Sequence, residues 1–284
     1  MAEMLRSLRP PRLEGLCSDA AKQDAAISIA QPCDGIERLE ARFAGRAFAP
    51  HRHDTYAIGI TLSGVQTFRY RGEARYCLAG QCHVLHPDET HDGAAGTEEG
   101  FSYRIAYVDP ALVQSALGGR PLPFVSNPVV DLTAAQQRAM MRVWTSDEET
   151  DELARTDIAA IVADFLMAMT AGHMPPTPLP LSQLQRVRES ISASPTKRHS
   201  MAELERLAGL DRWSLARQFR AAFGTSPSRF RTMRQLDMVR GMIRSGSRLA
   251  DAALAAGFSD QSHMSRLFKR TYGMTPARWV AALR

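Results

Sequence analysis

One short segment occurs twice in this chain, about fifty residues apart. The first copy is AGLDRWSLARQFRAAFGTSP at 208–227, and the second is AGFSDQSHMSRLFKRTYGMTP at 256–276. Gly224 aligns with Gly273 and Pro227 with Pro276, both at an offset of 49 residues. A solenoid needs about three or more repeats to bury a continuous core. Two copies therefore predict a duplicated recognition element.

Helix start and stop signals divide each copy into a helix, a short turn containing glycine and a second helix. Ser200 and Glu203 are spaced as a capping box, and Gly209 follows the helix that this box begins. The other start and stop signals are Asp211, Gly224, Ser226-Pro227, Gly257, Asp260, Gly273 and Thr275-Pro276. This order predicts two helix-turn-helix units joined by a long helix that continues to about residue 244.

The second helix of each unit has one apolar and one polar face. The apolar stripes, at spacings of four residues, are Leu215, Phe219 and Phe223 in the first and Met264, Phe268 and Tyr272 in the second. The outward residues are Arg212, Trp213, Ala216, Arg217 and Arg220 in the first and Gln261, Ser262, Ser265, Arg266 and Lys269 in the second. Arginine pairs well with guanine and glutamine with adenine in a major groove. A solvated helix face is the alternative interpretation.

Charge is divided unevenly along the chain. Residues 182–284 contain 19 Lys and Arg, of which 17 are Arg, against 7 Asp and Glu, so this part carries +12. The preceding 181 residues carry −7. Such asymmetry predicts a basic module that binds a polyanion, attached to an acidic module that does not.

The acidic half begins with strand-like segments. Short runs rich in β-branched and aromatic residues fill 36–109, and SGVQ and RGEA look like hairpin turns between them. Closely spaced strands without intervening helices predict an antiparallel barrel or sandwich. Three helical segments follow, PALVQSALGG, TAAQQRAMMRVW and the long segment beginning at 151. The apolar stripe of that last segment, which includes Ile161 and Phe165, fits either packing on the barrel or a dimer contact.

The proline-rich stretch GHMPPTPLPLSQ separates the two halves. We expect a flexible arm at 1–30, an acidic strand-rich domain at 31–172, a linker at 173–183 and a basic helical domain at 184–284. No apolar run is long enough to cross a membrane, and the first residues lack the apolar core of a signal peptide. These features predict a cytoplasmic protein.

The basic module resembles the DNA-binding region of the AraC/XylS family of bacterial transcription regulators. GFSDQSHMSRLFKRTYGMTP is very similar to the family's signature, and LERLAGLDRWSLARQFRAAFGTSPSRF is similar to its first unit. The resemblance implies seven helices, with two recognition helices in successive major grooves of double-stranded DNA. By matched position, the residues facing the DNA would be Trp213, Arg217, Gln261, Ser262, Ser265 and Arg266. Ala216 replaces the larger polar residues often found there, so the first helix is expected to read fewer bases.

The acidic half more loosely resembles the family's cupin-like effector-binding and dimerisation domain, through PHRHDTYAIGITLSGVQTFRYRG and GQCHVLHPDETHDG. His51 and His53 lie two residues apart and point to the same side of a strand. His86 and His91 follow in a segment that a barrel could bring opposite. We expect an effector pocket that uses His51, His53, Tyr56 and His91, although a metal site or structural histidines would fit the same pattern. Cupin enzymes usually have a glutamate where Ala57 stands, so no metal and no cofactor are expected.

The predicted fold is therefore α+β in two domains, an antiparallel cupin-like barrel with following helices and an all-α double helix-turn-helix. The predicted function is a DNA-binding transcription regulator that responds to a small molecule. We expect it to be a homodimer and, if an activator, to contact RNA polymerase. No nucleophile with an adjacent base and no phosphate-cradling glycine loop suggests catalysis. Two further hypotheses are a cupin metalloenzyme with a nucleic-acid-binding tail and an architectural DNA protein with little sequence preference.

Overall fold

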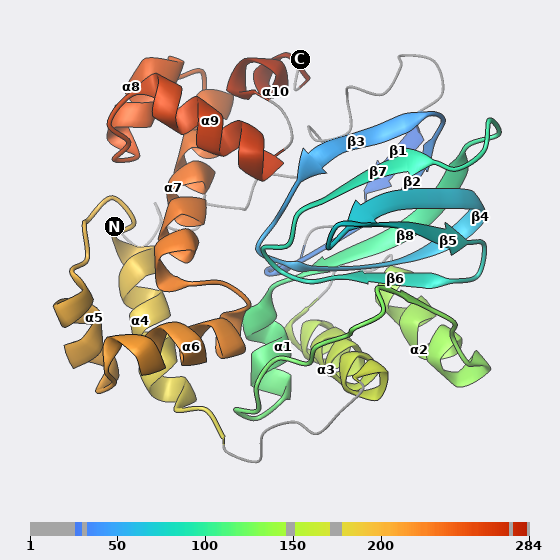
Figure 1. Cartoon of the computed structure of the whole chain (residues 1–284), viewed down its shortest axis with the longest axis horizontal. Coiled ribbons are helices and arrows are strands. Elements are labelled where there is room, and N and C mark those ends of the chain that lie inside the picture. Colours follow the sequence, from blue (N-terminus) through green and yellow to red (C-terminus); the bar gives the residue numbers. More distant parts are fainter. Residues whose placement is uncertain (1–25, 30–32, 146–150, 171–177, 273–274, 283–284) are drawn as a thin grey trace.

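The computed structural model describes residues 26–29, 33–145, 151–170, 178–272 and 275–282. Within these ranges the chain forms a β-domain with helices α1 to α3 on one face, followed by a helical domain made of α4 to α10 (Figure 1). The two domains lie side by side, and α6, α7 and α9 face the strand domain or its loops. No helix among the described residues is long and apolar enough to cross a membrane.

The strands form a mainly antiparallel sheet that branches at β4. Its main path runs β1-β2-β8-β4-β6-β9, while β5 pairs with β4, and β7 pairs with both β3 and β4. The strands are β1 (Ala26–Ile29), β2 (Ile36–Phe43), β3 (Arg46–His51), β4 (Tyr56–Tyr70), β5 (Glu73–Leu78), β6 (Cys82–Leu85), β7 (His91–Ala95), β8 (Phe101–Val108) and β9 (Val129–Val130). The antiparallel expectation is confirmed, whereas "barrel" is a loose description because the described strands do not close into a cylinder.

One of the two predicted hairpin turns is present. Arg71 and Gly72, both with positive φ, turn the chain between β4 and β5, so that Tyr70 pairs with Glu73. The predicted turn at SGVQ is absent, because β4, which is 15 residues long, continues through this segment. The pairing of β4 with β8 shifts between Thr61 and Ser63, which marks a bulge. The bulge lets one strand pass from one layer of sheet to the other, a common use of an extra residue.

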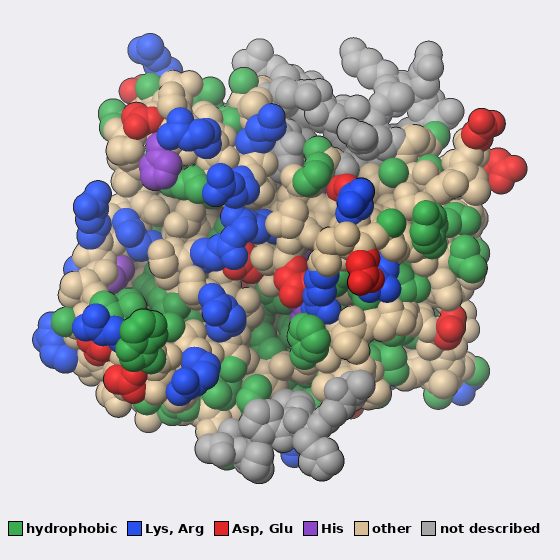
Figure 2. Space-filling model, in the orientation of Figure 1, with side chains coloured by type: hydrophobic (Ala, Val, Ile, Leu, Met, Phe, Trp, Pro, Cys, Tyr) green, Lys and Arg blue, Asp and Glu red, His purple; other side chains and the backbone are tan. Residues whose placement is uncertain are grey.

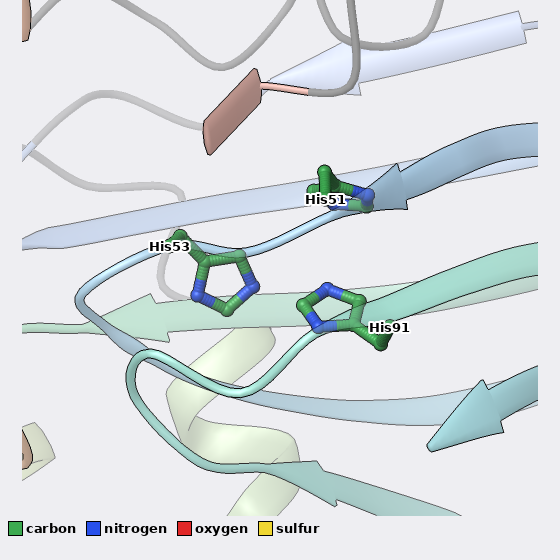
Figure 3. A group of neighbouring side chains, drawn as sticks. All are labelled: His51, His53 and His91. Carbon is green, nitrogen blue, oxygen red and sulfur yellow. The ribbon is translucent and has the colours of Figure 1, made fainter. Parts of the chain in front are cut away.

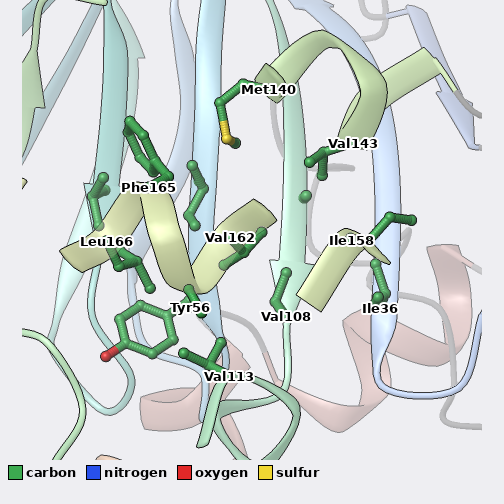
Figure 4. Close-up of a cluster of buried hydrophobic side chains, with 14 of the residues drawn as sticks. Ile36, Tyr56, Val108, Val113, Met140, Val143, Ile158, Val162, Phe165 and Leu166 are labelled. Atoms are coloured by element: carbon green, nitrogen blue, oxygen red, sulfur yellow. The ribbon is translucent and has the colours of Figure 1, made fainter. Parts of the chain in front are cut away.

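Helices α1 (Pro110–Ala116), α2 (Ala134–Thr145) and α3 (Glu152–Met169) cover one face of this sheet. Their apolar sides meet strand residues such as Tyr56 and Val108 in a single buried cluster (Figure 4). Phe165 is only 5% exposed there, and Ile161 is partly buried against the same cluster. The α3 stripe therefore packs on the sheet, the first of its two predicted roles. The other face of the sheet encloses a second cluster that contains Phe68, Tyr103 and Tyr107.

The expected arm and linker lie partly outside the described residues. Residues 1–25 and 171–177 belong to that part, but Ala26–Ile29 pair with β2, so the sheet begins inside the segment expected to be an arm. The linker ends earlier than predicted, because α4 already begins at Leu181. Just before α4, the Leu179 backbone N–H donates to the Gly119 carbonyl at 2.8 Å, which ties the helical domain to the end of α1.

The helical domain contains the seven predicted helices within the described residues. They are α4 (Leu181–Ala193), α5 (Met201–Ala208), α6 (Arg212–Phe223), α7 (Pro227–Arg244), α8 (Leu249–Ala255), α9 (Gln261–Tyr272) and α10 (Pro276–Ala282). Helix α7 contributes to two separate cores. Phe230 packs with the helices of the first unit, and Leu236, Val239 and Ile243 pack with those of the second.

Candidate functional site: two exposed helix faces and a histidine cluster

Helix α6 is fixed by its cap and its buried stripe. The Asp211 side chain accepts hydrogen bonds from the backbone N–H groups of Trp213 and Ser214, as predicted. Leu215, Phe219 and Phe223 are buried, at 0 to 3% exposure. On the opposite side Trp213 is 76% exposed. The predicted Arg212, Arg217 and Arg220 are exposed, and Ala216 is half-buried.

Helix α9 repeats this design in the second unit. The Asp260 carboxylate accepts from the His263 N–H at 2.7 Å, and this bond lowers the pKa of Asp260. Met264, Phe268 and Tyr272 are buried. The predicted outward residues Gln261, Ser262, Arg266 and Lys269 are exposed, and Ser265 is half-buried. The structure therefore gives both helices an inner apolar stripe and an outer polar face.

Positive charge collects on the helical domain. Figure 2 shows Lys and Arg side chains spread over the half of the surface formed by α5 to α9, with few acidic groups among them. Because the two exposed faces lie in one basic domain and α7 packs against both units, α7 holds both faces on a common frame.

Three of the predicted effector residues meet in the strand domain. His51 ends β3, His53 follows in the next loop and His91 begins β7, and their rings point toward one another (Figure 3). The ring centres of His51 and His91 are 4.4 Å apart, and those of His53 and His91 are 4.8 Å apart. The three side chains are buried, at 5 to 6% exposure. His51 and His91 are direct partners in the β3–β7 ladder, which explains how they meet.

Hydrogen bonds fix the tautomer of each ring. Nδ1 contacts a backbone carbonyl oxygen in every case, that of Ala49 for His51 at 2.8 Å, of Thr55 for His53 at 2.9 Å and of Glu89 for His91 at 3.0 Å. Because a carbonyl only accepts, Nδ1 carries the proton and Nε2 keeps its lone pair. Burial lowers the pKa of all three rings, to about 4 for His53, so they are neutral at neutral pH.

Two other predicted residues lie elsewhere. Tyr56 belongs to the cluster beneath α1 and α3 (Figure 4), and its hydroxyl donates to the Pro123 carbonyl at 3.2 Å. His86 accepts the Val125 N–H at 3.1 Å through Nε2 and so does not join the three histidines. His83 was not predicted from the sequence, and it is fully buried against the rings of Phe68 and Tyr103.

Polar residues close in sequence to the histidines contact the helical domain. Asp88 Oδ2 accepts from Arg229 at 2.7 Å and from the Thr225 hydroxyl at 3.0 Å. Asp54 forms an ion pair with Arg234 of α7. The Arg52 backbone N–H donates to the carbonyl of Thr271, at the end of α9, at 3.3 Å. We call these contacts of Arg52, Asp54 and Asp88 the interdomain latch. No periodic pattern marks them in the sequence.

The latch is tightly fitted and is linked to the histidine cluster. Asp88 donates its backbone N–H to the His53 carbonyl at 2.7 Å. Gly224, which ends α6 with φ of +73°, packs so closely on Pro87 that a Cβ there would lie 2.7 Å from the proline Cβ. The segments 51–54 and 87–91 therefore carry histidines on one side and the contacts of the helical domain on the other.

Two family models match the chain in the expected order. The AraC-like ligand binding domain matches residues 35–171, and a helix-turn-helix domain matches residues 204–282. The uncharacterized HTH-type transcriptional regulator YbfI of Bacillus subtilis is 26% identical over 234 residues, which cover 78% of this chain and 84% of that protein. The HTH-type transcriptional activator RhaS of Klebsiella pneumoniae is 25% identical over 253 residues, covering 84% of this chain and 89% of that protein.

Solved structures show the same arrangement of domains. A structure of ToxT from Vibrio cholerae superimposes with a TM-score of 0.59 at 11% identity, covering 87% of this chain and 98% of that one. Another ToxT structure, described as bound to an unsaturated fatty acid, gives a TM-score of 0.56 at 11% identity, covering 91% and 95% of the two chains. At this identity the likeness shows the fold alone.

Proposed function

Because the chain is an AraC-type transcription regulator, with a ligand-binding domain followed by a helix-turn-helix domain, we propose that α6 and α9 read two neighbouring segments of one DNA site. A signal received at the histidine cluster controls this reading through the interdomain latch. The observation that carries the proposal is the pair of exposed polar faces, on α6 and α9, held on opposite ends of α7. Two such helices of one chain can enter successive major-groove segments, roughly 34 Å apart.

The outer residues divide into two kinds of contact. Arg217 and Arg266 are the candidates for guanine, since a guanidinium pairs bidentately with its major-groove edge, and Gln261 is the candidate for adenine. Their neighbours Arg212, Arg220, Ser262, Ser265 and Lys269 supply phosphate and sugar contacts, which position the helices without reading sequence, and Trp213 supplies an apolar contact. Because α6 has Ala216 beside Arg217, it reads fewer bases than α9.

The effector site is proposed to be the cluster of His51, His53 and His91, without Tyr56. The support is geometric, since the three rings converge on one point while Tyr56 lies in the core beneath α1 and α3. Control of DNA binding requires that the effector bind more tightly to one arrangement of the domains than to the other. The latch offers two such arrangements, one with the helical domain held against the strand domain and one with it released.

A selection experiment tests the DNA-reading proposal. The full chain is mixed with random duplexes, bound sequences are enriched, and the preferred site is determined. We expect a site in two parts, separated by about one helical turn. A chain that binds random DNA as tightly as the selected site would instead be the architectural protein, and the proposal would fail. Mapping of the chromosomal sites that the protein occupies then identifies the regulated genes.

Self-association is proposed for the intact regulator but has to use a surface other than the α3 stripe. That stripe already packs on the sheet, with Val162 and Leu166 at 0% exposure. Sedimentation of the full chain tests this point directly, since a mass of one chain of 31.3 kDa at micromolar concentration would contradict it.

A further inference from the structure

The three clustered histidines have the arrangement of a metal site. One ring nitrogen from each of His51, His53 and His91 lies within 4.8 Å of the others, in a buried position. From these positions we infer that the cluster binds one divalent transition-metal ion of the zinc kind, and that this ion is the signal the regulator senses. The binding step stands by itself, and only the sensing step rests on the proposed function.

The tautomers suit a metal. An ion-binding histidine commonly donates its other ring N–H to a carbonyl or carboxylate, which orients the ring and directs the lone pair to the ion. All three rings donate Nδ1–H to a backbone carbonyl, so each presents Nε2. His53 Nε2 is buried and has no hydrogen-bond partner in the described structure. A buried nitrogen of this kind calls for a partner, and an ion among the three rings supplies one.

The spacing leaves a short movement to be made. A point among three atoms that lie within 4.8 Å of one another is at most about 2.8 Å from each, whereas zinc–imidazole bonds are about 2.0–2.1 Å. The coordinating nitrogen of each ring therefore has to move toward the ion by less than about 1 Å. Rotation about side-chain bonds, with a small shift of the loop that carries His53, is sufficient for this.

The ligand set indicates the class of ion. Imidazole suits zinc, copper, iron and nickel, whereas magnesium and calcium prefer oxygen ligands. The described cluster contains no carboxylate, and Ala57, where cupin enzymes usually have a glutamate, is buried in the sheet interior. From the sequence alone, this alanine counts against a metal. Three neutral imidazoles nevertheless make a complete protein set for an ion that keeps one position open for water or an effector oxygen.

Occupation of the site acts on the latch because the same segments carry both. Arg52 and Asp54 alternate with His51 and His53, and Asp88 is bonded through its N–H to the His53 carbonyl. Drawing the three rings toward an ion moves these segments toward the strand domain, away from Arg229 and Arg234. The ion's charge also attracts the carboxylates of Asp54 and Asp88. Both effects weaken the latch, so the ion releases the helical domain.

Metal binding is measured on the full chain after removal of metal by a chelator. We expect zinc titration by calorimetry, with elemental analysis, to give one tightly bound ion per chain, and magnesium to give none. His53→Gln and His91→Gln should lower zinc affinity at least 100-fold. His263→Gln, which changes a histidine of α9 outside the cluster, should leave it unchanged. Absence of tight zinc binding, or binding that survives both cluster variants, overturns the inference.

A second measurement does not depend on how the variants fold. The zinc absorption edge of the wild-type complex should show three imidazole nitrogens at about 2.0 Å. A shell dominated by oxygen or sulfur would refute the assignment. Both zinc measurements are made without DNA. A chain that selects a two-part DNA site but binds no zinc therefore refutes only the metal-binding inference. A chain that binds zinc but selects no site refutes only the DNA-reading proposal.

The sensing step is tested by the distance between the domains. Zinc should increase the fraction of wild-type molecules with a released helical domain, measured between spin labels on the two domains, and should not do so in His53→Gln. If the distribution of distances between the two labels is the same with and without bound zinc, the ion has no regulatory role.

Discussion

Replacement of Asp88 by asparagine should release the helical domain in a measurable fraction of molecules. Asp88 has φ of +65°, a left-handed conformation that asparagine tolerates much better than alanine does. The asparagine side-chain oxygen can still accept the Thr225 hydroxyl. The substitution therefore removes mainly the charge that faces Arg229 and Arg52, at 2.7 Å and 3.7 Å, and little else.

The expected size follows from the exposure of the two partners. The Asp88 side chain is 13% exposed and the Arg229 side chain 44%, so water screens the pair in part. Converting a charge-assisted bond into a neutral one costs about 1 kcal/mol, and the longer Arg52 contact adds a few tenths. Docking should therefore weaken by about 1–1.5 kcal/mol, which corresponds to a roughly 5- to 13-fold increase in the ratio of released to docked molecules.

The assay uses spin labels on two exposed positions, Glu73 of β5 and Leu254 of α8, both changed to Cys, with Cys17→Ser. The three described native cysteines are buried and are not expected to take up label. Distances are recorded at an ionic strength where both states are populated. A double-mutant cycle of Asp88→Asn with Arg229→Gln gives the coupling energy between these two side chains. Asp164→Asn, on the exposed side of α3, is the control for the loss of one negative charge. A coupling energy below about 0.3 kcal/mol would refute the latch.

Three further outcomes are expected. Arg217→Ala should relax one half of the selected DNA site and Gln261→Ala the other, each by about 1–3 kcal/mol per base pair; relaxation of the same half by both would contradict two separate readers. Phe165→Asp should abolish folding of the strand domain, seen by circular dichroism, because it places a charge in the core; a folded monomer would instead show that the stripe is a dimer contact. Gly224→Ala should destabilise the chain more than Gly209→Ala in thermal unfolding, since both glycines have positive φ but only Gly224 packs on the strand domain; equal losses would mean that this contact contributes nothing.

The helical domain was the easiest part to predict from sequence. Its helices are delimited by local signals, such as the Ser200 cap and the Gly209 stop, and both operate as expected. A cap or a left-handed glycine depends on about four neighbouring residues, so the sequence contains the whole cause. The turn predicted at SGVQ was wrong for the opposite reason. Gly64 could turn the chain back or mark a bulge, and the choice depends on strand β8, some forty residues away.

Only part of the histidine cluster could be predicted from the sequence. The two-residue spacing of His51 and His53 predicts that they share one side of a strand, but β3 ends at His51, and the distance from His91 depends on the β3–β7 register. Tyr56 was grouped with them because it is near in sequence, yet it lies on the face that meets α1 and α3. The latch had no sequence signal, because charged residues in turns are ordinary and only the docked domains show which arginine each one meets.

Helix α7 has a consequence for the evolution of the binding sites. It spans 18 residues, roughly 27 Å, and its two ends are buried in the separate cores of the two reading units. The distance and angle between α6 and α9 are thus set by a stiff rod inside one chain. A base substitution in either half of a promoter site weakens one contact and can be restored by another substitution. Insertion of a single base pair rotates one half of the site around the duplex relative to the other half. The fixed positions of α6 and α9 cannot adjust to this rotation. Promoters should therefore gain and lose this regulator by point changes, while the spacing inside their sites stays constant.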